Sequence, residues 1–247
     1  MGQNGLWRFD GKVFILRVEK SCLSLKYRNM NISDVFNQFC NDLQNRTGIM
    51  TEDNIRYYWF ASMLNQDPIL NNYTLEQPYS DNPIQVKILP NEELDLLYRS
   101  SAEIFCFEIK LHKEPKQTTL AETSAAGDIF NDIQRLQQIP QSVKGVATRH
   151  FFLYVTDGIM HNYFISKGQQ NPFFGQQLND FYNARINNPI NLNFSSAPKS
   201  FLNSANNSFK NNPTPITLFN LRLLHNRDFS LGCSSFNGKC HVRLYEI

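Results

Sequence analysis

The sequence predicts an α/β fold in which helices flank a central mixed β-sheet. Strand-like and helix-like segments alternate between residues 84 and 165, and the order strand, helix, strand is typical of a crossover connection. Hydrophobic residues make up 41% of the 247 residues, enough for a substantial globular core. The longest apolar runs are far shorter than the roughly 20 residues that span a bilayer, so no membrane partner is expected.

The N-terminal part is predicted to hold a hairpin followed by two helices. Residues 5–19 have the pattern of two short strands around Asp10 and Gly11, a pair typical of tight hairpin turns. Ser33 is a suitable N-cap for a helix that continues to about residue 45. Thr51 caps a second predicted helix, which ends near residue 65 before Asp67 and Pro68.

The middle of the chain is predicted to supply most of the sheet. A helix is expected between its strands, because the apolar residues after Asp128 recur at helical spacing until Pro140 ends the pattern. The turn-like pair Asp157 and Gly158 then leads into a further strand. The predicted strands cover residues 84–89, 94–98, 103–111, 149–155 and 159–165, and the helix covers 128–138.

The last third of the chain changes in composition. Residues 166–213 are rich in Asn, Gln, Ser, Phe and Pro, which predicts a long irregular excursion with a short helix near 175–185. Strands over 216–224 and 241–247 are expected to return to the sheet. We therefore expect a single domain over 1–247, with its core at about 50–165, an irregular insertion at about 166–213 and C-terminal strands at 214–247.

Charge, cysteine content and the N-terminus narrow the class of protein. The formal net charge of +2 neither demands nor excludes a nucleic-acid partner, because only a local basic patch would matter. Five cysteines without a Cys-x-x-Cys spacing indicate reduced thiols rather than a disulfide framework or a zinc site. The N-terminus lacks the pattern of a signal peptide, so a cytoplasmic protein is expected.

Charged side chains interrupt two of the predicted core strands. Asp95 lies between two leucines, and in the run 105–111 the residues Cys106, Glu108 and Lys110 share the face opposite the apolar side chains. Charges in so apolar a segment are costly unless they are paired, hydrogen-bonded or bound to a metal. The turn-like residues 99–102 predict a hairpin that brings Asp95 close to Glu108. Two carboxylates and a lysine would then form a site for a hard divalent cation.

The order of these elements resembles the PD-(D/E)xK nuclease superfamily, which has the restriction-endonuclease-like fold. The resemblance covers about residues 50–165: a helix with Glu52, a strand with Asp95, a strand with Glu108, Ile109 and Lys110, then the helix 128–138. The proline that names the motif is replaced by leucine at position 94. A second acid-x-lysine match, at residues 114–116, falls in a polar loop and is set aside.

The resemblance implies a DNA endonuclease, of a restriction or defence type, that hydrolyses phosphodiester bonds with Mg²⁺ or Mn²⁺. Asp95, Glu108 and the backbone carbonyl of Ile109 would hold the metal, which would activate a water molecule. Lys110 would orient that water or stabilise the phosphate. Glu52 would act as an outer ligand or as a ligand of a second metal.

Contacts with DNA are less well defined by the sequence. Lys113, Lys116 and Arg135 are the candidate contacts to phosphate, and a homodimer would suit double-strand cleavage. One alternative is a catalytically inactive module that binds nucleic acid or protein on the same fold. Another is a structural protein in which the charges form buried salt bridges. These alternatives differ in whether the carboxylates and the lysine meet at an open cleft.

Overall fold

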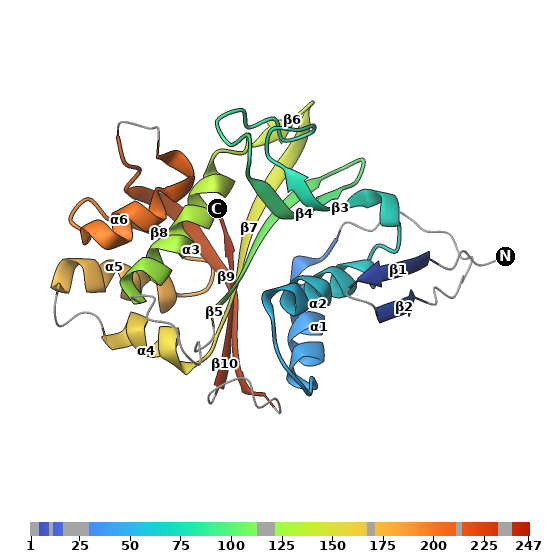
Figure 1. Cartoon of the computed structure of the whole chain (residues 1–247), viewed down its shortest axis with the longest axis horizontal. Helices are drawn as coiled ribbons and strands as arrows, with labels where there is room; N and C mark the ends of the chain where they lie inside the picture. Colours follow the sequence, from blue (N-terminus) through green and yellow to red (C-terminus); the bar gives the residue numbers. More distant parts are fainter. Residues whose placement is uncertain are drawn as a thin grey trace.

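The protein is an α/β structure in which helices flank a mixed β-sheet, as predicted (Figure 1). The computed structural model describes residues 5–9, 12–16, 30–112, 122–166, 171–210, 214–231 and 239–247. Within these ranges the main sheet has eight strands in the order β3-β4-β5-β7-β10-β9-β8, and β6 pairs with β7 at one end. Strands β5 and β7 run parallel, and the other neighbours are antiparallel.

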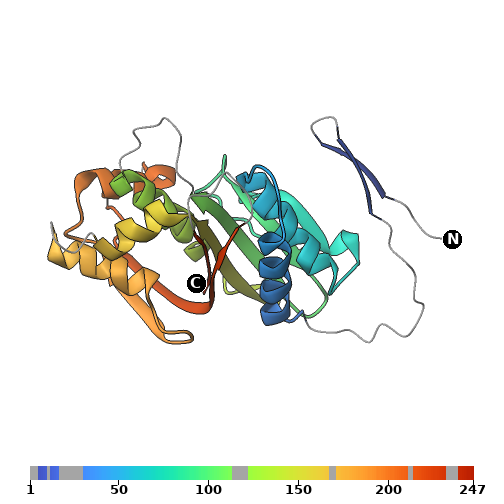
Figure 2. The same cartoon turned by 90° about the horizontal axis from the view of Figure 1, so that it is seen from below.

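The bounds of the elements follow in chain order. The helices are α1 (Ile32–Gln44), α2 (Glu52–Leu64), α3 (Glu122–Gln137), α4 (Gly158–Ser166), α5 (Pro172–Tyr182) and α6 (Lys199–Ala205), with short 3-10 turns at Leu70–Asn72 and Asn207–Phe209. The strands are β3 (Tyr73–Pro78), β4 (Glu93–Arg99), β5 (Ile104–His112), β6 (Ser142–Val143), β7 (Val146–Thr156), β8 (Pro189–Asn193), β9 (Leu218–Ser230) and β10 (Lys239–Glu246). A separate antiparallel hairpin pairs β1 (Gly5–Phe9) with β2 (Lys12–Leu16), and Figure 2 shows both of its strands.

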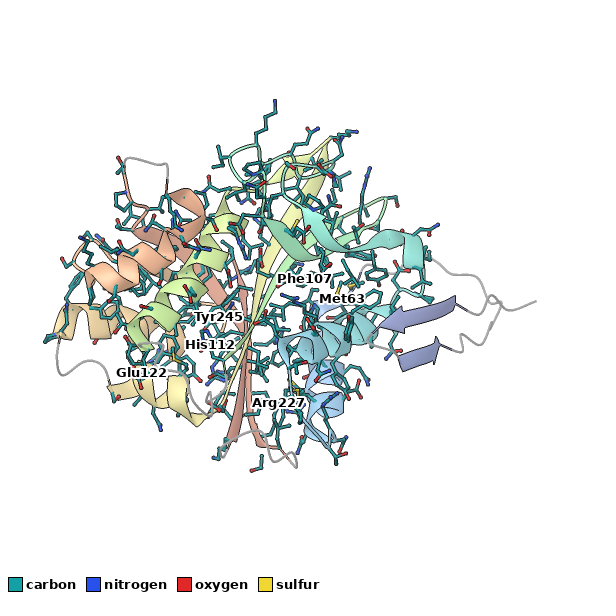
Figure 3. The ribbon with its side chains drawn as sticks, in the orientation of Figure 1. Met63, Phe107, His112, Glu122, Arg227 and Tyr245 are labelled. Atoms are coloured by element: carbon teal, nitrogen blue, oxygen red, sulfur yellow. The ribbon has the colours of Figure 1, made fainter. Side chains whose placement is uncertain are left out.

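The two faces of the sheet carry different helices. Helices α1 and α2 cover one face, and α3 to α6 cover the other (Figure 1). Figure 3 shows Met63 and Phe107 on the α1–α2 side, and Tyr245 and His112 on the opposite side. Strand alternation explains this division, because successive side chains of β5 point to opposite faces.

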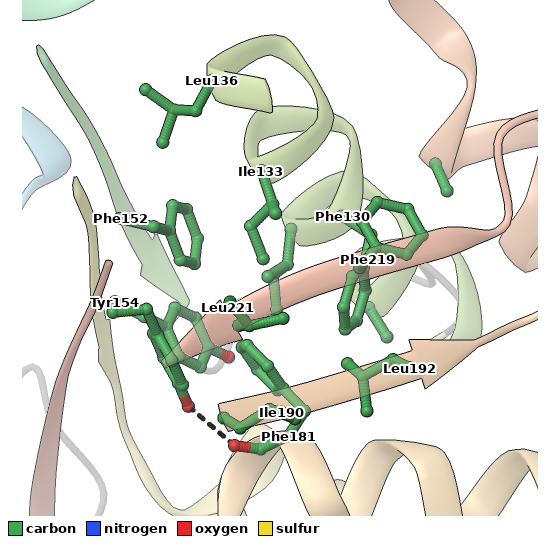
Figure 4. Close-up of a cluster of buried hydrophobic side chains, with 14 of the residues drawn as sticks. Phe130, Ile133, Leu136, Phe152, Tyr154, Phe181, Ile190, Leu192, Phe219 and Leu221 are labelled. Atoms are coloured by element: carbon green, nitrogen blue, oxygen red, sulfur yellow. Dashed lines mark hydrogen bonds between the residues drawn. The ribbon is translucent and has the colours of Figure 1, made fainter. Parts of the chain in front are cut away.

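The core beneath α3 is built largely from phenylalanine. The ring centroid of Phe130 lies 4.6–5.5 Å from those of four other phenylalanines, namely Phe181, Phe194, Phe201 and Phe219. Figure 4 labels Phe130, Phe181 and Phe219 of this group. Three of these come from the segment predicted as an irregular insertion. The short helix predicted near 175–185 corresponds to α5 (Pro172–Tyr182), but burial of these rings also orders the rest of the segment into the edge strand β8 and helix α6, which were not predicted.

Local signals explain where the first helices begin. Thr51 caps α2 as predicted: its side chain accepts the N–H of Asn54, and the Asn54 side chain accepts the N–H of Thr51. The predicted cap of α1 was wrong. Asn31 rather than Ser33 caps that helix, because the Asn31 carboxamide accepts the N–H groups of Ser33 and Asp34.

Two predicted strands are wrong. Residues 84–89 form turns, because the N–H of Val86 bonds to the carbonyl of Tyr79 and Gln85 takes a positive φ of 55°. Ile84, Val86 and Leu89 of this segment are buried all the same, whereas Ile88 is exposed, so the hydrophobic pattern did not indicate a strand. The segment 159–165 belongs to helix α4, since a short apolar run does not distinguish a strand from a buried helix. Helix α3 also begins six residues earlier than expected.

Among the described residues, no helix combines the length and the apolar character that a membrane crossing needs.

Helices α3 and α6 approach so closely that only glycine fits at position 127. A Cβ atom there would lie 2.5 Å from the carbonyl oxygen of Phe201 and 2.7 Å from the Cβ of Ser204. We expect Gly127→Ala to lower the free energy of unfolding by about 1–3 kcal/mol through overpacking, although alanine favours helices. Urea denaturation measures the change. Asn37→Ala on the exposed face of α1 is the control, and an equal effect of both variants would contradict this explanation.

Candidate functional site

The candidate site forms where strands β4 and β5 separate. Their ladder runs from the pair Arg99 and Ile104 to the pair Leu96 and Phe107, although β5 continues to residue 112. Beyond that point β5 still pairs with β7 on its other edge, but on the edge that faced β4 two N–H groups bond to carboxylates instead of to a strand. The N–H of Ile109 donates to Oδ2 of Asp95 at 2.6 Å. Two residues later, on the same edge, Leu111 donates to Oε2 of Glu52 at 3.2 Å.

On the outer side of this gap, Arg56 of helix α2 joins the two carboxylates. Its Nη2 lies 2.7 Å from Oδ1 of Asp95 and 3.0 Å from Oε1 of Glu52. Its Nη1 lies 3.3 Å from Oδ1 of Asp53. Burial raises the pKa of Asp95, and the Arg56 guanidinium and the Ile109 N–H partly offset that rise.

On the inner side, Glu108 is 2% exposed and has a partner on each carboxylate oxygen. Oε1 accepts the hydroxyl of Tyr79 at 2.7 Å, and Oε2 lies 3.1 Å from Nη2 of Arg135. Arg135 also binds Asp132 at 2.8 Å and Glu92 at 2.5 Å. Burial raises the pKa of Glu108 well above its usual range; Arg135 opposes this shift, whereas nearby carboxylates add to it.

Lys110 lies between the outer and inner sides. Its Nζ is 3.9 Å from Oε2 of Glu52 and 3.8 Å from Oδ2 of Asp132, distances longer than those of hydrogen bonds. Burial by itself would lower the pKa of Lys110, but the carboxylates of Asp132 and Glu52 outweigh it and raise the pKa. The raised pKa keeps the ammonium charged, and about a quarter of the side chain is exposed.

The charged cluster contains more acids than bases. Five carboxylates, each less than one-third exposed, face three cations, which leaves two excess negative charges when all are ionised. Among the described residues, no group of three or more His, Cys, Asp or Glu side chains is already arranged to hold a metal ion. The members of the cluster are Glu52, Glu92, Asp95, Glu108, Asp132, Arg56, Lys110 and Arg135.

The structure brings together the four residues predicted to be catalytic, namely Glu52, Asp95, Glu108 and Lys110. Ile109 contributes its N–H to Asp95, and the predicted role of its carbonyl as a metal ligand stays a prediction. Lys113 and Lys116 lie outside the described residues. Both Nη atoms of Arg135 contact carboxylates of the cluster. The predicted contact of Arg135 with nucleic acid also stays a prediction.

Sequence reasoning missed Arg56, Glu92 and Asp132 of the cluster and Tyr79 beside it, and it assigned Arg135 to DNA rather than to ion pairs within the cluster. Arg56 follows Glu52 at the i,i+4 spacing of a helical ion pair, so that spacing was an available signal. Asp132 and Arg135 have the i,i+3 spacing of another such pair. The hydroxyl of Tyr79 reaches Glu108 only through the tertiary fold, and no sequence pattern indicates it.

Breaking the inner ion pair should cost much more than breaking a surface pair. We expect Arg135→Met to lower the free energy of unfolding by about 3–5 kcal/mol, because the buried carboxylate of Glu108 then lacks its cation. The matched control is Arg149→Met, which breaks a half-exposed pair with Glu246 and should cost about 1 kcal/mol or less. Chemical denaturation measures both, and equal losses would contradict the buried pairing.

The pKa of Asp132 predicts a pH dependence of stability. Burial raises this pKa from 3.8 to about 6, so the folded protein holds the proton more tightly than the unfolded chain does. The free energy of unfolding should therefore fall as the pH rises from about 4 to about 6. Asp132→Asn should flatten this slope in denaturation curves taken across that range. Asp81→Asn, on an exposed turn, should keep the wild-type slope, and an unchanged slope in Asp132→Asn would refute the assignment.

The elements that carry the cluster are, in chain order, helix α2, strands β4 and β5, and helix α3, and Glu92 directly precedes β4. The cluster lies at the opening between β4 and β5. Comparisons of the chain with family models, with curated proteins and with solved structures give no match. The resemblance to PD-(D/E)xK nucleases therefore stays a prediction that the residues of the cluster have to support.

Proposed function

We propose that the charged cluster is the catalytic centre of a Mg²⁺- or Mn²⁺-dependent hydrolase that cleaves DNA phosphodiester bonds. One observation carries the proposal. Side chains from a helix and two strands meet at a gap in the sheet: Glu52 from α2, Asp95 from β4, and Glu108 and Lys110 from β5. Acids combined with one accessible amine form a suitable set for phosphodiester hydrolysis.

The donor chemistry of the cluster fits a hard divalent cation. Carboxylate and carbonyl oxygens are the ligands that Mg²⁺ prefers, and one such ion would neutralise the two excess negative charges. Asp95, Glu108 and the carbonyl of Ile109 are the proposed ligands, and Glu52, which shares Nη2 of Arg56 with Asp95, is a further ligand. When bound, the metal would lower the pKa of a water molecule and neutralise charge on the phosphate. Because arginines already pair with these carboxylates, the metal has to replace at least one of them.

The remaining residues act on the substrate and on the ligands. Lys110 is charged and partly exposed, so its ammonium can bind a phosphate oxygen or orient the attacking water. Tyr79 and Arg135 hold Glu108 from two sides and thereby fix the direction of its carboxylate. The N–H of Ile109 does the same for Asp95. These contacts reduce the reorganisation that the reaction requires.

The second candidate function is a catalytically inactive module that binds nucleic acid or protein. One observation favours it: both oxygens of Asp95 and both oxygens of Glu108 already have internal partners. In that case the cluster would serve only to join α2, α3 and the sheet. DNA as the partner, and a homodimer, are proposals under either function.

The proposed hydrolase is tested by incubating plasmid DNA with the protein and Mg²⁺ or Mn²⁺. We expect Lys110→Ala to reduce metal-dependent cleavage by about 100-fold or more while it keeps the fold, because Lys110 makes no short ion pair. Glu108→Gln should abolish cleavage. Lys87→Ala, on an exposed turn, removes the same charge elsewhere and should retain full activity.

One outcome would contradict the role of Lys110, and another would contradict the hydrolase itself. Undiminished cleavage by Lys110→Ala would remove this residue from the mechanism. A wild-type protein that binds DNA in a gel-shift assay but cleaves it with neither metal would favour the binding module.

A further inference from the structure

A single nitrogen atom of Arg56 stands where a cation would bridge two carboxylates. Nη2 contacts Oδ1 of Asp95 from strand β4 and Oε1 of Glu52 from helix α2. Among the described residues, neither carboxylate has another cation at so short a distance, since Lys110 lies 3.9 Å from Glu52. The guanidinium therefore acts as the internal counter-ion of the outer half of the cluster.

The position of Arg56 allows it to leave this contact. About a quarter of its side chain is exposed, and Nη1 already faces Asp53, whose carboxylate is 67% exposed. A rotation of the side chain would therefore give up two contacts of Nη2 and keep a partner at the surface. The i,i+3 spacing of Asp53 and Arg56 on the helix keeps that partner within reach.

Arg135 forms the opposite case. Only 14% of its side chain is exposed, and it binds three carboxylates from separate parts of the chain, namely Glu92, Glu108 and Asp132. Its departure would leave Glu108 buried without a cation, which is strongly unfavourable. Of the two arginines, Arg56 is therefore the one that a metal ion can replace.

We propose that Arg56 is a built-in counter-ion, which occupies the cation position between Glu52 and Asp95 and yields it to a divalent metal. Once displaced toward Asp53, its guanidinium lies at the protein surface beside the site and can bind a phosphate of the substrate. This inference rests on the proposed metal-dependent function and specifies which residue competes with the metal.

Competition has a consequence that needs no catalytic assay. Arg56 protects the buried Asp95 carboxylate while no metal is bound, and every metal ion that binds has to displace it. Without this guanidinium, the metal-free protein should be less stable and the affinity for metal should be higher. Binding and displacement are linked, so the two effects should appear together.

The test is thermal unfolding of the full-length protein during titration with MgCl₂, and separately with MnCl₂. Arg56→Gln should have a lower Tm than wild type without metal and a larger gain in Tm with metal. Its midpoint concentration of metal should fall by about tenfold, within the usual range of coupling between two binding events. The matched control is Arg46→Gln, since Arg46 bonds to Tyr58 and Asn54 rather than to a carboxylate. It should keep the wild-type midpoint.

Two further variants make the result specific. Glu52→Gln combined with Arg56→Gln should lose most of the metal-dependent gain, because one bridging carboxylate is gone. Arg56→Lys keeps the charge but has one terminal nitrogen in place of the two Nη atoms. It therefore cannot contact Asp53 and, at the same time, bridge Glu52 and Asp95. Its midpoint should lie between those of wild type and Arg56→Gln, and it supplies the comparison if Arg56→Gln does not fold.

The outcomes separate this inference from the proposed function. If metal stabilises wild type and the Arg56 variants with the same midpoint, Arg56 does not compete with the metal, and the hydrolase proposal stands. If neither metal stabilises wild type or any Arg56 variant, the metal-dependent function itself fails. Stabilisation that survives the double substitution would place the metal elsewhere and overturn the role of Arg56.

Discussion

The separation of β4 from β5 is the constraint on which the charged cluster depends. Once the ladder ends at Phe107, the buried N–H groups of Ile109 and Leu111 need acceptors, because an unpaired backbone amide in the interior is costly. Carboxylates satisfy them, and this brings Asp95 and Glu52 into the sheet. Buried carboxylates in turn need cations, which α2 and α3 supply from opposite faces. Backbone hydrogen bonding thus determines where the charges gather.

The two hydrophobic cores hold this gap in place. On one face, Trp59 packs its ring edge-on against Phe107, the last β5 residue of the ladder, and so anchors α2 close to the opening. On the other face, Phe130 fixes α3 within a cluster of aromatic rings. Rigid packing of both helices keeps Arg56 and Arg135 on opposite sides of the sheet. The charges are therefore positioned by apolar contacts more than by one another.

Local sequence patterns predicted which strands and which helix carry the acidic residues of the site. The side chains that contact those acids depend on the tertiary structure. The sequence placed Asp95 and Glu108 on a hairpin and Glu52 at the start of a helix, because strand alternation and N-capping are local properties. The same reasoning failed at residues 84–89, where Ile84, Val86 and Leu89 are buried within consecutive turns rather than within a strand. It also could not locate Tyr79, which reaches Glu108 across 29 positions of the chain. Contacts of that range depend on how the layers pack, which no short pattern encodes.

The asymmetry of the cluster bears on the choice between a structural and a catalytic role. A salt-bridge network that only joined helices to the sheet would gain most from balanced charge and complete burial, and apolar side chains of similar size would often do as well. Here the inner half around Arg135 is closed, whereas Arg56 and Lys110 on the outer half each remain about a quarter exposed. The cluster as a whole also carries an excess of carboxylates. An accessible half with two cationic side chains beside a closed half is what a site for a phosphate requires, and a purely structural network has no need of it.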